Sequence, residues 1–284
     1  GMRFWIVGGG TGGHVYPGLA VVQALQAIEP DAALTWVGGE SGMERALVER
    51  AGLPFIDIPA GGVHGVGLSR MAHNTIRLFR GLGVALRVVA REQPDALLTT
   101  GGYVSVPVAL AAWLRRVPVM IFLPDVEPAL SVKVVARLAA RIGVTVEDSR
   151  KYLPDSKVEV TGYPLRDEIT RWDRRSGREV LGLPATAPVL LVFGGSRGAR
   201  SINRAVLKNL PALLEEVEIV HITGQLDWDE VAQARAQLLD AQQMHYHTFP
   251  YLHEQMGAAL AAADLVVSRA GASILGEFPY FGLP

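Results

Sequence analysis

The sequence has 284 residues, of which 49% are hydrophobic and 19% are charged, and its formal net charge at pH 7 is −1. This composition excludes a disordered chain, and the balanced charge excludes the strongly basic surface of a dedicated nucleic-acid binder. The chain has no cysteine, which excludes disulfides and thiolate metal sites.

Short, apolar, β-branched runs alternate with longer segments of helical periodicity along the chain. This alternation is typical of parallel sheets with helices on both faces, so we predict an α/β fold. The helical segments include residues 42–51, 69–91 and 201–216. The predicted strands are residues 4–7, 34–37, 55–58, 96–99, 119–122, 141–144, 157–160, 189–193, 218–222, 246–248 and 265–267.

A glycine-rich loop at residues 8–14 joins the first predicted strand to a helical segment. Glycines let the backbone approach a phosphate, and free N–H groups at a helix start point toward it. The spacing differs from the dinucleotide fingerprint, and no Gly-Lys-Ser/Thr follows as in a nucleoside-triphosphate loop. His14 ends the loop and can exchange a proton near neutral pH, so it is a candidate catalytic residue.

Two further glycine turns, at residues 101–102 and 194–199, also follow predicted strands. One such turn is as compatible with simple turn chemistry as with binding, but three favour a diphosphate ligand, which needs several N–H donors. We place the domain seam near residues 162–166 and predict two α/β domains, residues 1–163 and 164–284. Ligands bind such sheets at the carboxyl ends of the strands, so two facing domains would bring their loops to one cleft.

The second domain contains four predicted strands, and the chain stops after Gly-Leu-Pro, so we expect this domain to be truncated. The longest apolar stretch, residues 104–123, is interrupted by Arg115, Arg116 and Pro118, so we predict no transmembrane helix.

Other side chains have two interpretations each. Arg166 follows a rigid Gly-Tyr-Pro turn and either points into the cleft or forms a surface ion pair. Glu277 either binds ribose hydroxyls or complements a helix dipole. The helix at 69–91 is basic and amphipathic, as expected for a helix lying on anionic lipid, although a charged solvent face gives the same pattern. The nearest candidate for metal binding, His245-x-His247, lacks a third ligand, so we predict no metal site.

Five motifs, in the same order along the chain, closely resemble the MurG family of peptidoglycan N-acetylglucosaminyltransferases. This resemblance implies a GT-B fold, in which two Rossmann-like domains with parallel sheets face a cleft. It also implies an inverting transfer, without metal or cofactor, of N-acetylglucosamine from UDP-N-acetylglucosamine to the 4-hydroxyl of the muramoyl-pentapeptide on undecaprenyl diphosphate. That step converts lipid I to lipid II. The motifs occupy residues 9–14, 17–20, 101–107, 194–199 and 268–272.

The resemblance also implies partners and site residues. The partners are the sugar nucleotide, the lipid-linked acceptor and an anionic membrane surface, with the enzyme peripheral on the cytoplasmic side of the bacterial cell membrane and no nucleic acid involved. In the donor site, Ser196 contacts phosphate, Leu252 and Met256 flank the uracil, and Glu277 holds the ribose. The acceptor-binding residues implied are Thr11, Gly12, Gly13, Gly101, Gly102, Tyr103 and Ser105. The donor-binding residues implied are Arg166, Gly195, Ser196, Gly198, Leu252, Met256, Ala272 and Glu277.

One departure from the family pattern concerns the acceptor side. Residues 122–125 read Phe-Leu-Pro-Asp where the family has His-Glu-Gln-Asn, so Asp125 is a second candidate for the general base. This replacement leaves open a GT-B transferase with another acceptor, or a UDP-N-acetylglucosamine epimerase. The arginine-rich helix also leaves open a non-catalytic scaffold on a membrane surface.

Overall fold

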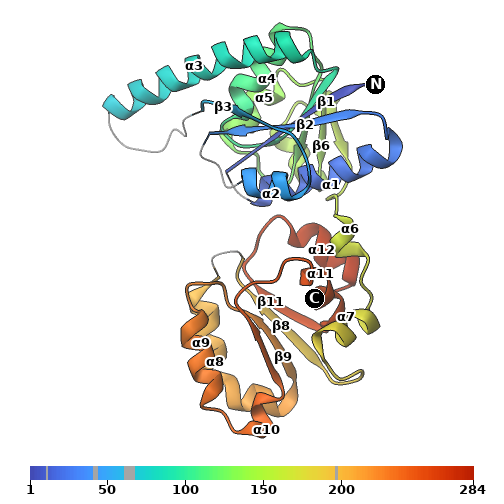
Figure 1. The fold of residues 1–284 in the computed structure, drawn as a ribbon, viewed down its shortest axis with the longest axis vertical. Coiled ribbons are helices and arrows are strands. Elements are labelled where there is room, and N and C mark those ends of the chain that lie inside the picture. Colours follow the sequence, from blue (N-terminus) through green and yellow to red (C-terminus); the bar gives the residue numbers. More distant parts are fainter. Residues whose placement is uncertain (11, 41–43, 61–67, 196–197) are drawn as a thin grey trace. The chain divides into compact units, whose positions relative to one another are not determined.

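The computed structural model describes residues 1–10, 12–40, 44–60, 68–195 and 198–284, with only the backbone described for 12, 68–72 and 74. The chain divides into two compact units, Gly1–Arg166 and Asp167–Pro284, and the predicted seam after residue 163 lies close to this division. Each unit contains one parallel sheet with helices packed against it (Figure 1). The predicted α/β class, with two Rossmann-like sheets, is confirmed.

The first unit contains a parallel sheet with the strand order β3-β2-β1-β4-β5-β6-β7. The order reverses between β1 and β4, and the loops after these two strands are the first two glycine loops. Such a reversal is where α/β sheets bind ligands. The strands are β1 (Arg3–Gly8), β2 (Ala33–Gly39), β3 (Phe55–Ile58), β4 (Ala96–Gly101), β5 (Val119–Leu123), β6 (Arg141–Val144) and β7 (Val158–Val160). The helices are α1 (Gly12–Ile28), α2 (Glu44–Arg50), α3 (Leu68–Glu92), α4 (Ser105–Leu114) and α5 (Leu130–Ala136), with short 3-10 turns η1 (Glu147–Tyr152) and η2 (Asp155–Lys157).

Helices cover both faces of the first sheet because its strands are apolar on both faces. In β1, Ile6 belongs to a buried cluster with Val15 of α1. Its neighbour Val7 belongs to a different cluster, with Val108 of α4. Successive residues of a strand point to opposite faces, so these two clusters are the cores above and below the sheet.

The second unit has a four-stranded parallel sheet with the order β10-β9-β8-β11. Its strand order reverses between β8 and β11, and the third glycine loop follows β8. Leu190 packs in a cluster with Val206 of α8, and Leu191 packs in another with Leu260 of α11, so this sheet is also covered on both faces. The strands are β8 (Val189–Phe193), β9 (Glu218–Ile222), β10 (Tyr246–Phe249) and β11 (Leu265–Ser268). The helices are α6 (Asp167–Thr170), α7 (Arg174–Leu181), α8 (Arg200–Glu216), α9 (Trp228–Ala236), α10 (Asp240–Gln243), α11 (Met256–Ala262) and α12 (Ile274–Phe281).

The predicted strands and helical segments agree with the structure in place and type. All eleven predicted strands are present, with ends that agree within two residues. The helix predicted at 42–51 is α2, whose described part begins at Glu44, and residues 42 and 43 lie outside the described residues. Among the described residues, no helix combines the length and the apolarity that a membrane span requires.

Candidate functional site

The first two glycine loops pack directly against each other at the carboxyl edge of the first sheet. Gly102 has a φ of +94°, and a Cβ at this position would lie 2.7 Å from the carbonyl oxygen of Gly9. Only glycine adopts this conformation readily and leaves room for the neighbouring backbone. The Thr100 hydroxyl donates a hydrogen bond to the carbonyl oxygen of His14, which also ties the two loops together. The structure therefore brings the predicted residues Gly102 and His14 to one place.

The imidazole of His14 has a defined orientation. Its Nδ1 lies 2.9 Å from the carbonyl oxygen of Gly9. A carbonyl oxygen can only accept, so Nδ1 carries the proton and, in the neutral ring, Nε2 keeps a lone pair. A Cβ at Gly101, whose φ is +117°, would lie 3.2 Å from this Nε2. Glycine at 101 therefore avoids a side chain that would crowd Nε2.

A closed ring of three hydrogen bonds braces the second glycine loop. The Ser105 hydroxyl donates to the carbonyl oxygen of Gly101 at 2.9 Å, so it accepts from the Thr99 hydroxyl at 2.5 Å. Thr99 in turn accepts the N–H of Gly101 at 3.2 Å. Both hydroxyls are buried. We therefore assign Ser105 to the support of the loop, whereas the sequence suggested direct acceptor contact.

We expect Ser105→Ala to lower the free energy of unfolding of the first unit by about 1–3 kcal/mol. The physical reason is that it removes the hydroxyl that donates to the carbonyl of Gly101 and the oxygen that accepts the proton of the Thr99 hydroxyl, both in a buried place. Chemical denaturation measures this change. Thr99→Ser is the matched control, because it keeps the hydroxyl and so the ring. A Ser105→Ala protein as stable as the Thr99→Ser protein would contradict the bracing role.

Four further acceptor-side candidates, Gly12, Gly13, Tyr103 and Asp125, follow the carboxyl ends of strands of the first sheet. Gly12 and Gly13 are the first two residues of α1, where backbone N–H groups have no partner inside the helix. Tyr103 is 41% exposed, and Asp125 is exposed just after β5. Thr11 lies outside the described residues.

Sequence reasoning did not single out Glu44, a buried carboxylate beside the first glycine loop. Its side chain is 2% exposed. One carboxylate oxygen accepts the N–H of Gly39 at 3.0 Å, and the other accepts the N–H of Gly10 at 3.5 Å. These bonds connect the ends of β1 and β2. In the sequence, Glu44 looks like an ordinary acidic residue in the first turn of a helix, where it complements the dipole.

In the second unit, the loop after β8 packs onto the end of β9. Gly198 has a φ of +78°, and a Cβ at this position would lie 2.2 Å from the carbonyl oxygen of Thr223. The N–H of Gly198 also donates to the carbonyl of Gly195 at 3.0 Å. Helix α8 then begins at Arg200 without a side-chain cap, so the N–H groups of its first turn suit a phosphate. Ser196 lies outside the described residues.

The other predicted donor-binding residues of this unit lie around the same edge. Leu252 and Met256 are partly buried against the core cluster that also receives Phe193, the last residue of β8. Phe193 makes an edge-on contact with Phe278, at 6.2 Å between ring centroids. Phe278 belongs to α12, and Glu277 is in the first turn of that helix. Ala272 is partly buried just before α12.

Arg166, which the resemblance places in the donor site, is the last residue of the first unit. Its guanidinium carbon lies 4.1 Å from the ring centroid of Tyr16. Tyr16 is on α1, two residues after His14. A guanidinium over an aromatic face is a cation–π contact, which holds Arg166 beside the first glycine loop in this structure.

A buried series of hydrogen bonds lies under the donor loop. His221 on β9 is fully buried, with Nδ1 2.6 Å from the Tyr246 hydroxyl and Nε2 2.8 Å from the side-chain oxygen of Asn203. The side-chain amide of Asn203 donates to Asp227 at 2.9 Å, and Asp227 accepts from Arg200 at 3.0 Å. We call the buried members of this series, Tyr246, His221, Asn203 and Asp227, the buried polar chain; Arg200, whose side chain is 60% exposed, ends it at the surface.

Burial lowers the pKa of His221 from 6.5 to about 4, because the charged imidazolium loses its hydration. Between these values the unfolded chain binds a proton that the folded chain does not. The stability that neutral His221 contributes is therefore complete above pH 6.5 and is lost as the pH falls toward 4, by up to about 3 kcal/mol. An NMR titration of the ring protons checks this: we expect a midpoint near pH 4, and a midpoint near 6.5 would contradict it.

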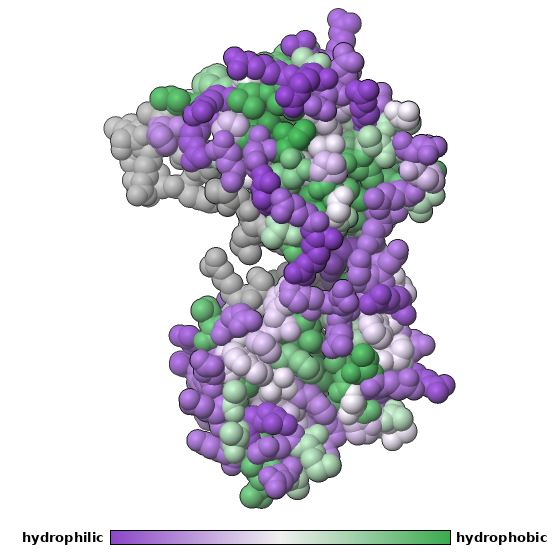
Figure 2. All heavy atoms as spheres, viewed as in Figure 1, coloured by the Kyte–Doolittle hydropathy of each residue, from purple (hydrophilic) through white to green (hydrophobic). Residues whose placement is uncertain are grey.

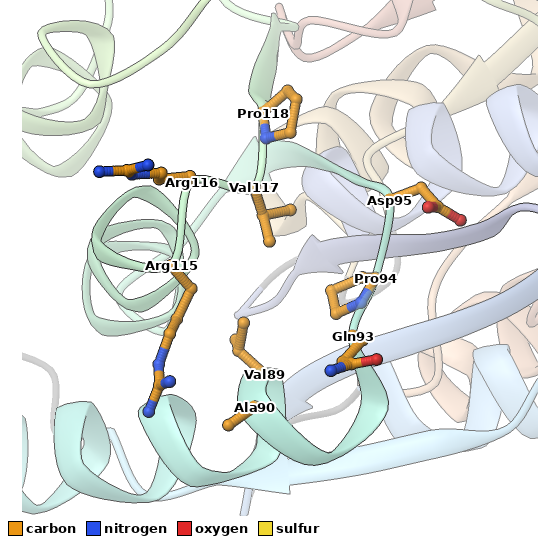
Figure 3. A pocket seen from close by; sticks show the side chains of 9 residues that line it. All are labelled: Val89, Ala90, Gln93, Pro94, Asp95, Arg115, Arg116, Val117 and Pro118. Atoms are coloured by element: carbon orange, nitrogen blue, oxygen red, sulfur yellow. The ribbon is translucent and has the colours of Figure 1, made fainter.

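A hollow of about 520 Å³ lies at the opposite edge of the first sheet (Figure 3). Pro94 and Asp95, just before β4, and Pro118, just before β5, line it, together with Arg115 and Arg116 after α4. It faces the carbonyl ends of α3 and α4, which carry partial negative charge. Because the glycine loops lie at the carboxyl ends of the strands, this hollow is separate from the candidate site.

The His245-x-His247 pair finds a partner in Glu218. The carboxylate of Glu218 is buried and lies 2.6 Å from Nδ1 of His245 and 2.8 Å from Nε2 of His247. Both histidine side chains are thus paired with the Glu218 carboxylate. Throughout the described part of the chain, no group of three His, Cys, Asp or Glu residues is arranged to hold a metal ion.

Comparison with known proteins identifies both units. Residues 4–144 match the glycosyltransferase family 28 N-terminal domain, and residues 189–284 match the C-terminal domain of the same family. The whole chain is 44% identical to the UDP-N-acetylglucosamine--N-acetylmuramyl-(pentapeptide) pyrophosphoryl-undecaprenol N-acetylglucosamine transferase of Roseiflexus sp. (strain RS-1). It is 40% identical to the protein of the same name in Desulforudis audaxviator (strain MP104C). The chain covers 76% and 77% of these two relatives.

Solved structures agree with this result. The crystal structure of Acinetobacter baumannii MurG has a TM-score of 0.70 and 29% identity, over 96% of this chain and 74% of that one. A UDP-GlcNAc 2-epimerase from Neisseria meningitidis has a TM-score of 0.66 over 98% of this chain and 80% of that one, but only 15% identity, so it shares the fold alone. The chain therefore belongs to the MurG family of glycosyltransferases, within glycosyltransferase family 28.

Proposed function

We propose that this chain is an N-acetylglucosaminyltransferase that moves N-acetylglucosamine from UDP-N-acetylglucosamine to the lipid-linked muramoyl-pentapeptide, converting lipid I to lipid II in peptidoglycan synthesis. The observation that carries this proposal is the 44% identity, along the whole chain, to a transferase named for that donor and acceptor. Both family domains are present, and each contains a glycine loop at the carboxyl edge of its sheet.

In the proposed reaction, the 4-hydroxyl oxygen of the muramoyl residue attacks the anomeric carbon of N-acetylglucosamine. The bond from that carbon to the diphosphate oxygen breaks on the opposite face, so the configuration inverts and UDP leaves. A base takes the hydroxyl proton as the new bond forms. His14 is our first candidate, because its Nδ1 is committed to the carbonyl of Gly9 and Nε2 has a lone pair. Asp125 is the second candidate.

Backbone N–H groups supply the proposed anion binding on both sides. The starts of α1 and α4 face the acceptor diphosphate, whereas the loop at 194–199 and the start of α8 face the donor diphosphate. Stabilising the leaving UDP in this way needs preorganised donors that do not move during the reaction. The tight packing of Gly198 onto Thr223 supports such preorganisation.

A turnover assay on the full-length protein tests the proposal. UDP release from UDP-N-acetylglucosamine is measured with and without a lipid I analogue, and the sugar products are identified. Acceptor-dependent UDP release with a lipid II product supports the proposal. Turnover on a different acceptor would contradict the substrate assignment, and an epimerised sugar without acceptor would contradict transfer. An absence of calorimetric heat with the sugar nucleotide would favour the non-catalytic scaffold.

We also propose that the protein works peripherally at the cytoplasmic face of a bacterial membrane, where its lipid-linked acceptor resides. The support is on α3, which carries the basic pattern and leaves Ile76 66% exposed and Phe79 69% exposed. Figure 2 shows hydrophobic residues, in green, exposed among hydrophilic ones, in purple, on the surface of the first unit. Apolar side chains beside arginines suit the boundary of an anionic bilayer.

Vesicle co-sedimentation tests this placement. Phosphatidylglycerol vesicles should retain the wild-type protein, and replacing both Ile76 and Phe79 by serine should weaken that retention by roughly a hundredfold or more, because each buried apolar side chain contributes roughly 1.5–3 kcal/mol. The matched control replaces Leu239 and Met244, which are 71% and 72% exposed in the second unit, by serine. Equal retention of the two double variants would contradict the proposal.

A further inference from the structure

The buried polar chain ends at the floor of the donor loop. The side-chain amide of Asn203 donates to the carbonyl oxygen of Thr223 at 2.9 Å. This is the same oxygen against which Gly198 packs so closely that a Cβ would lie 2.2 Å from it. The Thr223 carbonyl is therefore held on one side by a buried side chain and contacted on the other by the glycine loop.

Each hydrogen bond of the buried polar chain has only one possible direction. The Asn203 amide nitrogen faces two acceptors, Thr223 O and a carboxylate oxygen of Asp227, so the nitrogen and oxygen of this amide cannot be exchanged. The amide oxygen then faces His221, whose Nε2 must donate to it. In the neutral ring Nδ1 accepts, and the Tyr246 hydroxyl donates to it. The low pKa of His221 keeps this ring neutral.

The buried polar chain also connects three elements near the donor loop: α8, β9 and α9. Asn203 is in the first turn of α8, directly after the loop. His221 is the last but one residue of β9, and Thr223 directly follows that strand. Asp227 stands at the start of α9 and is buried, and it accepts from both Asn203 and Arg200. A fully satisfied buried network of this kind fixes the relative positions of the elements it joins.

We propose that Asn203 and His221 are positioning residues for the donor diphosphate loop. Through the Thr223 carbonyl, they hold Gly198, and with it the start of α8, where the first N–H groups of that helix are presented to the diphosphate. The Tyr246 hydroxyl is the donor that Nδ1 of His221 requires, and so Tyr246 acts on the loop from a distance, through two intervening side chains. This inference rests on the proposed function, because it needs the loop at 194–199 to bind the donor.

Tyr246→Phe is the sharpest test, since it removes one hydroxyl and changes no atom that touches the loop floor. Without that donor, Nδ1 of His221 keeps a buried lone pair that has no partner, which weakens the hold of the ring on Asn203. We expect the Kd for UDP, measured by calorimetry on the full-length protein, to rise between about threefold and tenfold. Tyr280→Phe is the matched control: its hydroxyl donates to the carbonyl of Thr170 on the surface, and its Kd for UDP should stay at the wild-type value.

A purely structural role would give a different result. In that case Tyr246→Phe would lower the melting temperature while the folded protein bound UDP normally. Amide hydrogen exchange provides a second readout: we expect faster exchange at residues 198–203 and 223–227, with other strands of the unit unchanged. Asn203→Ala, which removes the bond to Thr223 itself, should weaken UDP binding more than Tyr246→Phe does.

The outcomes distinguish a failure of the donor assignment from a failure of the positioning role. If the wild-type protein does not bind UDP, the donor assignment fails, and the positioning role fails with it. If the wild type binds UDP and both Tyr246→Phe and Asn203→Ala, folded by circular dichroism, bind it equally well, only the positioning role is overturned. Weaker binding in both variants, with Tyr280→Phe unaffected and exchange changes confined to the loop and its floor, supports it.

Discussion

Replacing His14 by asparagine lowers kcat by between about a hundredfold and ten-thousandfold, which is the usual contribution of a general base. Asparagine is the informative substitution because its amide nitrogen can take the place of Nδ1 and keep the hydrogen bond to the Gly9 carbonyl. The variant therefore removes the lone pair of Nε2 while the loop keeps its shape. UDP release with saturating substrates measures the change.

Asp125→Asn is the counterpart of this experiment. Asp125 is exposed after β5, two strands from β1 in the sheet order, and it too lies at the carboxyl edge. If His14 is the base, Asp125→Asn retains most of the turnover. The reverse result, with normal kcat in His14→Asn and a large loss in Asp125→Asn, would transfer the role to Asp125. Binding of UDP alone should be unchanged in both variants, because neither touches the donor loop.

The overall fold was predictable because its signals are local. The central strands are short apolar runs buried on both faces, such as residues 189–193, and helices alternate with them along the chain. The glycine loops were equally visible, since Gly101, Gly102 and Gly198 all adopt a positive φ that other residues rarely accept. These signals depend only on residues that are close together in the sequence.

The exact contacts of the site were less predictable, because they join residues far apart in the sequence. The pattern around Ser105 is the same whether its hydroxyl faces a ligand or closes a ring with Thr99, and only the structure distinguishes the two. Glu44 reaches Gly10 across 34 residues. The link from Asn203 to Tyr246 passes through His221, a residue that looks like any polar residue in a strand.

Gly198→Ala is expected to lower kcat/KM for the donor by about a hundredfold or more, the effect of displacing a binding group by roughly 1 Å. The added Cβ would lie 2.2 Å from the carbonyl oxygen of Thr223, a distance that no relaxation of a side chain can relieve, because both atoms belong to backbone-fixed positions. The loop must therefore move away from its floor. Donor KM and the Kd for UDP should both rise, whereas acceptor binding in the first unit should be unaffected.

Gly182→Ala tests whether left-handed backbone strain, without the collision with Thr223, is enough to cause this loss. Gly182 has a φ of +68° at the end of α7, similar to the +78° of Gly198, but a Cβ there would meet nothing within 4 Å. Both substitutions impose the same left-handed strain, about 1–2 kcal/mol, and only Gly198→Ala adds the collision with Thr223. Equal kinetic losses in the two variants would attribute the effect to general destabilisation. A loss confined to Gly198→Ala means that the close approach of the loop to β9 is itself what places the donor diphosphate, because the strain is common to both proteins.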